Sequence, residues 1–135
     1  MSALSIADRL DIQDLFARYC FLVDQGKADE WTALFSPDGV FDVPGLAHMV
    51  GPAQIRQIAE MVASKSQGKW RHQITNLLAE PDGENGARVT MYSLVTDWSG
   101  AGSVGTFNDY TGRLRKIAGQ WRIVELVAKP TKITV

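Results

Sequence analysis

The chain has 135 residues, of which 45% are hydrophobic and 21% are charged, as expected for one soluble globular domain spanning residues 1–135. Its 14 Lys and Arg residues are balanced by 15 Asp and Glu residues, and the net charge of -1 argues against nucleic acid and anionic membranes as partners. No apolar run approaches the roughly 20 residues that span a bilayer, and Met1–Leu4 lacks a signal pattern, so we expect a cytoplasmic protein.

The first predicted element is a long helix from Ser5 to about Asp24. Ser5 and Asp8 have the spacing of an N-terminal capping box, and Gly26 is a stop signal after the helix. The single cysteine, Cys20, excludes an internal disulfide and a multi-cysteine zinc site, and we interpret it as a small buried hydrophobe. Apolar residues fall on two faces, one with Ile6, Leu10, Ala17 and Phe21, the other with Ile12, Leu15, Phe16, Tyr19 and Leu22. We therefore expect a helix that is covered on more than one side, with Asp24 ending an apolar stripe.

Two more helices and a short strand follow. A short helix is predicted over residues 30–35, and the turn signal at 36–39 leads into a strand over 40–43. Residues 46–50 form an apolar connection. A third helix begins at Pro52, and its amphipathic stripe consists of Ile55, Ile58, Ala59 and Val62.

After Gly68 the hydrophobic period changes to two, which predicts strands. The first strand has one face made of Trp70, His72, Ile74, Asn76 and Leu78. Later strands are predicted over 87–98, 104–116 and 121–127, with turns between them. The tail, 129–135, either adds an edge strand or frays.

This order of elements predicts an α+β fold. About three N-terminal helices would pack on a strongly curved, mostly antiparallel sheet as a cone-shaped barrel. Strands of ten or more residues imply strong twist, and hence a concave face. A long helix lying across that face leaves room for a ligand cavity.

Asp24 and His72 are the main candidates for chemistry. A carboxylate that ends an apolar stripe is costly unless it is paired, and imidazole titrates near neutral pH and suits general acid–base work. A carboxylate that accepts from one ring nitrogen fixes the tautomer and raises the basicity of the other nitrogen. Tyr19 could donate to a substrate oxygen, and Asn76, on the same strand face as His72, could donate to it as well.

Each of these residues has a structural alternative. A lone histidine on a strand is more often a core or surface residue, and Asp24 could cap the segment that follows it. Tyr19 could belong to the core, and Asn76 could hold a turn. On an ideal helix Tyr19 and Asp24 are about 140° apart, so they share a pocket only if it wraps the helix end or the helix frays. We interpret His48 as structural or as part of a pocket lid.

Several segments, taken in order, carry a family resemblance: 12–20, Asp24, Trp31 with 34–39, 51–55, 72–76 and 119–123. Together they resemble SnoaL-like proteins of the nuclear transport factor 2-like superfamily, and most closely the branch of scytalone dehydratase, bile-acid 7α-dehydratase and hexachlorocyclohexane dehydrochlorinase. Members of that branch use an Asp–His pair, often with a nearby Tyr, and the resemblance assigns these roles to Asp24, His72 and Tyr19. One departure is Gly112, where many relatives have an acidic residue.

The resemblance implies a cofactor-independent, dehydratase-like lyase or isomerase that acts on a small hydrophobic cyclic substrate (steroid-, polyketide- or aromatic-like), with no metal. The aromatic residues expected to form the walls of its pocket are Phe16, Phe21, Trp31, Phe41, Trp70 and Tyr92. The alternative is a non-catalytic ligand-binding or assembly subunit, such as the small subunit of ring-hydroxylating dioxygenases. A homodimer or homotrimer is expected in either case. An Asp24–His72 hydrogen bond that opens onto an apolar cavity would favour the enzyme, and a collapsed cavity would favour the subunit.

Overall fold

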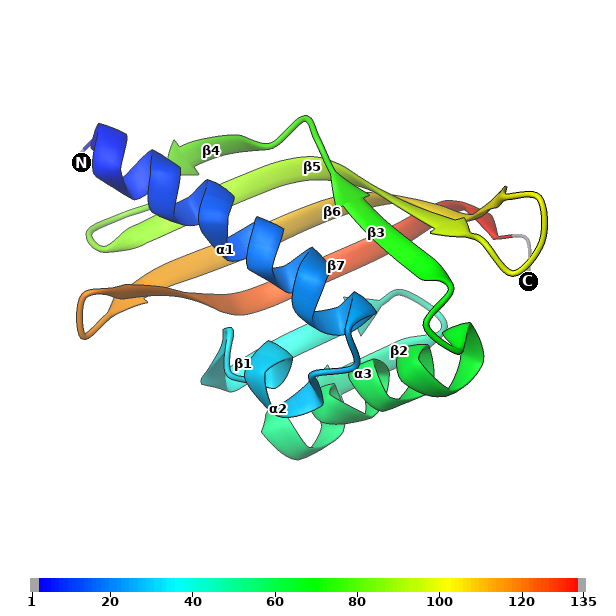
Figure 1. Cartoon of the computed structure of the whole chain (residues 1–135). Helices are drawn as coiled ribbons and strands as arrows, with labels where there is room; N and C mark the ends of the chain where they lie inside the picture. Colours follow the sequence, from blue (N-terminus) through cyan, green and yellow to red (C-terminus); the bar gives the residue numbers. More distant parts are fainter. Residues whose placement is uncertain (1–2, 134–135) are drawn as a thin grey trace.

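The computed structural model describes residues 3–133, and over this range three helices pack on one curved seven-stranded sheet (Figure 1). The helices are α1 (Ile6–Asp24), α2 (Ala28–Thr32) and α3 (Pro52–Ser66). The strands are β1 (Phe35–Val43), β2 (Ala47–Val50), β3 (Trp70–Ile74), β4 (Leu78–Pro81), β5 (Gly86–Asp97), β6 (Ser103–Ile117) and β7 (Gln120–Ile133). No helix within these residues is long and apolar enough to cross a membrane.

The sheet has the order β2-β1-β7-β6-β5-β3, and β4 also pairs with β5. Its pairs are antiparallel except for β1 and β7, which are parallel. The predicted α+β fold, with helices on a curved and mostly antiparallel sheet, is confirmed. The sheet does not close on itself, so the barrel in that prediction is an open, curved sheet (Figure 1).

Helix α1 begins as the sequence predicts and lies across one face of the sheet (Figure 1). Ser5 is its N-cap, and the capping box with Asp8 is formed in both directions. The buried residues of α1 itself are Ile12, Leu15, Phe16, Tyr19, Cys20 and Val23. Ile6, Leu10 and Phe21 are exposed, so the expectation that the helix is covered on more than one side was wrong. The side of α1 that faces the sheet is buried, and the helix also contacts α2 and α3.

The other elements differ from the prediction mainly at their ends. Residues 36–39, which were predicted to form a turn, lie inside β1, where its register with β7 shifts. Residues 46–50, which were predicted to form a connection, include β2, which pairs with β1. The strand expected over 70–78 is split into β3 and β4. The tail continues β7 to Ile133, and the last two residues lie outside the described range.

Alternation along β5 and β6 builds the concave face of the sheet. Inward-facing residues of these strands include Ala87, Val89, Met91, Ser93, Asn108, Tyr110 and Leu114, all of them buried. Under α1 an aromatic cluster continues this core, with Trp31 fully buried between Tyr19, Phe35 and Phe41. The face is therefore apolar at one end and has polar side chains at Ser93, Asn108 and Tyr110.

Asp8 ties the start of α1 to the hairpin between β6 and β7. Its Oδ1 accepts hydrogen bonds from Lys116 Nζ at 3.0 Å and from Trp121 Nε1 at 3.1 Å. The bond from Lys116, together with those from Ser5 and Trp121, lowers the pKa of Asp8 from its ordinary 3.8 to about 2. This carboxylate therefore stabilises the folded state only while it is ionised.

We predict that Asp8→Asn lowers the free energy of unfolding by about 1–2 kcal/mol near neutral pH. The folded-state pKa is depressed, so the stabilisation is present above the unfolded-state pKa and is lost as the pH falls from about 4 to about 2. Urea denaturation at several pH values should show the gap between wild type and variant closing over that window. Asp11→Asn, an exposed change on the same helix, is the control, and a gap that does not depend on pH would contradict the prediction.

Candidate active site

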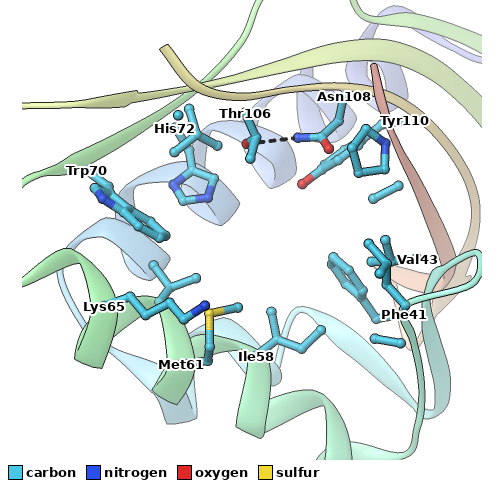
Figure 2. Close-up of a pocket in the computed structure, with 17 residues that line it drawn as sticks. Phe41, Val43, Ile58, Met61, Lys65, Trp70, His72, Thr106, Asn108 and Tyr110 are labelled. Atoms are coloured by element: carbon cyan, nitrogen blue, oxygen red, sulfur yellow. Dashed lines mark hydrogen bonds between the residues drawn. The ribbon is translucent and has the colours of Figure 1, made fainter. Parts of the chain in front are cut away.

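A cavity of about 480 Å³ lies between α3, the hairpin of β1 and β2, and the concave face of the sheet (Figure 2). Most of its lining is apolar, including Phe41 and Val43 of β1 and Ile58 of α3. The polar side chains that reach it are Lys65, His72, Thr106, Asn108 and Tyr110. A concave apolar site with a few polar groups is typical of small-molecule binding.

Asp24 and His72 meet at the wall of this cavity. Asp24 is the last residue of α1, and His72 lies on β3, where its pairing with Val95 of β5 directs the side chain to the concave face. The ring Nδ1 lies 2.6 Å from Asp24 Oδ1, and the backbone N–H of His72 donates to Oδ2 at 2.9 Å. Both side chains are only 9% exposed. One carboxylate therefore fixes the main chain and the ring of the same residue.

This arrangement sets the orientation of the imidazole. An ionised carboxylate only accepts hydrogen bonds, so the proton of a neutral His72 ring lies on Nδ1 and Nε2 is left as the free acceptor. Figure 2 shows the His72 ring pointing into the cavity. The pair is therefore arranged as a base, oriented by Asp24, beside the space where a ligand would lie.

Tyr19 does not line the cavity but lies directly behind it. It is 2% exposed, and its hydroxyl is 3.2 Å from the hydroxyl of Tyr110, a residue that does line the cavity. Burial raises the pKa of both phenols above the ordinary value of 10, so both remain neutral and can donate a proton in a hydrogen bond. Tyr19 can thus influence a ligand through Tyr110.

Asn108 and its neighbours on β6 were missed by the sequence analysis. Asn108 is buried, lines the cavity and donates from Nδ2 to Thr106 Oγ1 at 3.3 Å. Thr106, Asn108 and Tyr110 stand two residues apart on one strand, so all three face the same side. The period-two alternation that places Trp70 and His72 on one face also places these three residues on one face of the strand predicted over 104–116.

Five residues expected at the pocket lie elsewhere. Trp31 is in the core, and Phe16 is a buried residue of α1 that lines a separate groove between α1 and β3. Phe21 and Tyr92 are exposed, and Tyr92 packs on Phe107 outside the cavity. Asn76 lies beyond the end of β3, and its Oδ1 accepts a hydrogen bond from the Tyr92 N–H at 3.1 Å. This contact with the backbone agrees with the alternative that Asn76 has a structural role in a turn.

The remaining expected residues are placed as follows. Phe41 and Trp70 line the cavity. His48 is exposed and pairs with Asp42 across the β1–β2 hairpin at 2.9 Å, so it does not face the ligand space. Cys20 is buried, and burial raises the pKa of its thiol to about 12, as expected for a packing residue. Among the described residues, no group of three or more His, Cys, Asp or Glu side chains could hold a metal ion.

Residues 4–127 match the model of the SnoaL-like domain. The chain belongs to the SnoaL-like family. The match spans most of the chain and confirms the resemblance drawn from the sequence segments. None of the curated proteins gives a significant match.

Solved structures show the same fold. A point variant of Rv3472, a protein of unknown function from Mycobacterium tuberculosis, is 30% identical over 95% of this chain and 74% of its own, with a TM-score of 0.84. A protein from Catenulispora acidiphila in complex with S-DNPA is 25% identical, with 93% and 95% covered and a TM-score of 0.81. A scytalone dehydratase-like protein from Novosphingobium aromaticivorans is 19% identical, with 94% and 86% covered and a TM-score of 0.84. That last likeness shows the fold alone.

Gly112, the expected departure from relatives, has no room for a side chain. A Cβ atom there would lie 2.9 Å from Val89 Cγ2 and 3.4 Å from Leu126 Cδ1. Both neighbours are fully buried. At this position the concave face is closed by apolar packing and offers no place for an acid.

We predict that Gly112→Ala lowers the free energy of unfolding by about 1–3 kcal/mol because the added methyl overpacks the core. Gly100→Ala is the matched control, since a Cβ at Gly100 meets nothing within 4 Å. Urea denaturation of both variants measures the difference. Equal stability of the two would contradict the close packing around Gly112.

Proposed function

We propose that this protein is a cofactor-independent lyase or isomerase, of the dehydratase type, for a small hydrophobic cyclic molecule. The observation that carries the proposal is the Asp24–His72 hydrogen bond at the wall of an apolar cavity of about 480 Å³. Membership of the SnoaL-like family and the small-molecule complex of a relative support a ligand-binding role for this cavity. The geometry meets the condition that favours an enzyme over a subunit with a collapsed cavity.

In the proposed reaction His72 Nε2 removes a proton from a carbon made acidic by a neighbouring carbonyl group. Asp24 stabilises the imidazolium that forms, because its carboxylate already accepts from Nδ1. Tyr110, backed by Tyr19, donates to the carbonyl oxygen as negative charge develops on it. Asn108 lies on the same strand face and can bind a second oxygen of the substrate.

The two reaction types differ in where the proton goes. In a dehydration the C–H electrons form a C=C bond, the neighbouring C–O bond breaks, and the proton held on His72 leaves with the hydroxyl as water. In an isomerisation His72 returns the proton to a different carbon of the same enolate. Both need one base that works as an acid afterwards, and a histidine oriented by a carboxylate can do both.

The second candidate function is a non-catalytic assembly subunit. The observation in its favour is the pair of rings Tyr92 and Phe107, whose centroids are 5.4 Å apart, with Tyr92 exposed and outside the cavity. An exposed aromatic side chain such as Tyr92 suits contact with another chain. A homodimer or homotrimer remains a prediction under either function.

The test is proton exchange at carbon, which does not need the natural substrate. Wild-type protein is incubated in D2O with a panel of steroid and aromatic cyclic ketones, and NMR follows loss of the α-protons. We expect exchange that falls by about 10²-fold or more in His72→Ala and Asp24→Asn, because the oriented base is lost. His48→Ala is the matched control, since His48 also pairs with an aspartate but is exposed.

Full exchange activity in His72→Ala or Asp24→Asn would contradict the catalytic pair. Ketones that bind, detected as a rise in melting temperature, but do not exchange with the wild type would favour the non-catalytic alternative. Melting temperatures of all variants show whether the fold survives.

We also predict that Tyr110→Phe slows exchange more than Tyr19→Phe. Tyr110 reaches the cavity, whereas Tyr19 acts only through it, so removing the Tyr110 hydroxyl should cost about 10²-fold in kcat and removing that of Tyr19 less. The same NMR measurement at saturating ketone compares the two variants. A larger loss in Tyr19→Phe would assign the donor role to Tyr19, contrary to the proposal.

A further inference from the structure

The two ends of the cavity differ in depth. Three of its residues, Leu46, Met61 and Lys65, are exposed and frame a mouth. Asn108 and Tyr110 are 7% and 4% exposed and form the floor. A bound molecule would therefore meet hydroxyl and amide groups at its deep end and the Lys65 side chain at its outer end.

Lys65 is the one Lys or Arg among the residues that line the cavity, where no Asp or Glu occurs. It lies in the last turn of α3, and Figure 2 shows its side chain extending from α3 toward the cavity, on the side that also holds Trp70 and His72. The lining thus carries a positive charge at the mouth.

Within the part of the chain that the structure describes, Lys65 has no hydrogen-bonding or ion-pair partner. Its helix neighbours at the i−4 and i−3 positions are Met61 and Val62, so α3 supplies no acid for it. Arg56 on the same helix, by contrast, pairs with both Asp29 and Glu60. The positive charge at the mouth is therefore left for solvent or for a ligand.

Asp24 is not an ion-pair partner of Lys65. Its two carboxylate oxygens already accept from the ring and the backbone N–H of His72, and Asp24 is not among the residues that line the cavity. The positive charge of Lys65 also interacts favourably with the dipole at the C-terminus of α3. That interaction does not require the cavity and does not depend on which ligand the cavity holds.

We propose that the natural ligand is an organic anion: an apolar cyclic body whose oxygen function reaches Tyr110 and whose carboxylate, or similar acidic group, pairs with Lys65 at the mouth. This rests on the proposed function only in taking the cavity as the substrate site. A ligand that covers the apolar mouth partly removes water from the ammonium, and an acidic group of the ligand then replaces that water with a charge-assisted hydrogen bond.

Two fluorescent probes test this proposal on the full chain. 8-Anilinonaphthalene-1-sulfonate and N-phenyl-1-naphthylamine share one aromatic body, and only the first carries an anionic group. Fluorescence titration at low ionic strength gives the dissociation constant of each probe. We expect Lys65→Met to weaken binding of the sulfonate by about tenfold, the size of one charge-assisted hydrogen bond, and to leave the neutral probe unchanged.

Two control variants separate charge from other effects. Lys65→Arg keeps the charge and should keep the sulfonate affinity, and Lys69→Met removes an exposed lysine that does not line the cavity and should change neither probe. The proposal is overturned if Lys65→Met leaves sulfonate binding unchanged or weakens both probes equally. That result leaves the proposed function intact if exchange in His72→Ala still falls by about 10²-fold or more. If the neutral probe does not bind the wild type, the cavity is not a binding site for apolar molecules. That result would contradict both the proposed function and the anionic ligand.

Discussion

The site depends on one carboxylate that joins a helix end to a sheet edge. Asp24 accepts from the backbone N–H and from the ring of His72, so it holds β3 against the last turn of α1 and fixes the imidazole in the same contact. The backbone bond would remain if His72 were replaced, whereas removing the Asp24 carboxylate would break both bonds. The chemical role and the structural role of Asp24 are therefore separable: His72 variants test the first, and Asp24 variants test both together.

The position of the cavity follows from how the concave face is filled. Under α1 the face is packed with large apolar side chains, and at Gly112 even an added Cβ atom would lie only 2.9 Å from Val89 Cγ2. Farther along the same strands α1 has ended, and the cavity lies between α3 and the sheet (Figure 2). The polar residues Asn108 and Tyr110 occur where the packing stops, because buried polar groups need partners that an apolar core does not provide. The place where the helix ends is thus also where the ligand space begins.

Much of this could be predicted from the sequence, since it depends on local pattern. The capping box at Ser5, the stripe of α3 and the period-two strands specify the α+β fold, and the odd place of Asp24 at the end of an apolar stripe pointed to His72. Residues whose placement depends on tertiary packing were not predictable in this way. Phe21 lies on an apolar stripe of α1 but faces away from the sheet, and Asn76 keeps the alternation of β3 but stands after the strand has ended. The hydrophobic period of a sequence shows which residues share a face, whereas only the packed structure shows which face is covered.

The same distinction explains the position of Tyr19 behind Tyr110. Tyr19, five residues before Asp24, looked like a pocket donor, yet the helix turns it into the core and its hydroxyl ends on Tyr110. Burial keeps both phenols protonated, so the second hydroxyl stabilises and orients the first rather than competing with it for a proton. A donor held in this way loses little freedom when charge develops on a substrate oxygen. The exposed Lys65 at the mouth has no such support, and its flexible chain suits selection of a ligand by charge more than catalysis.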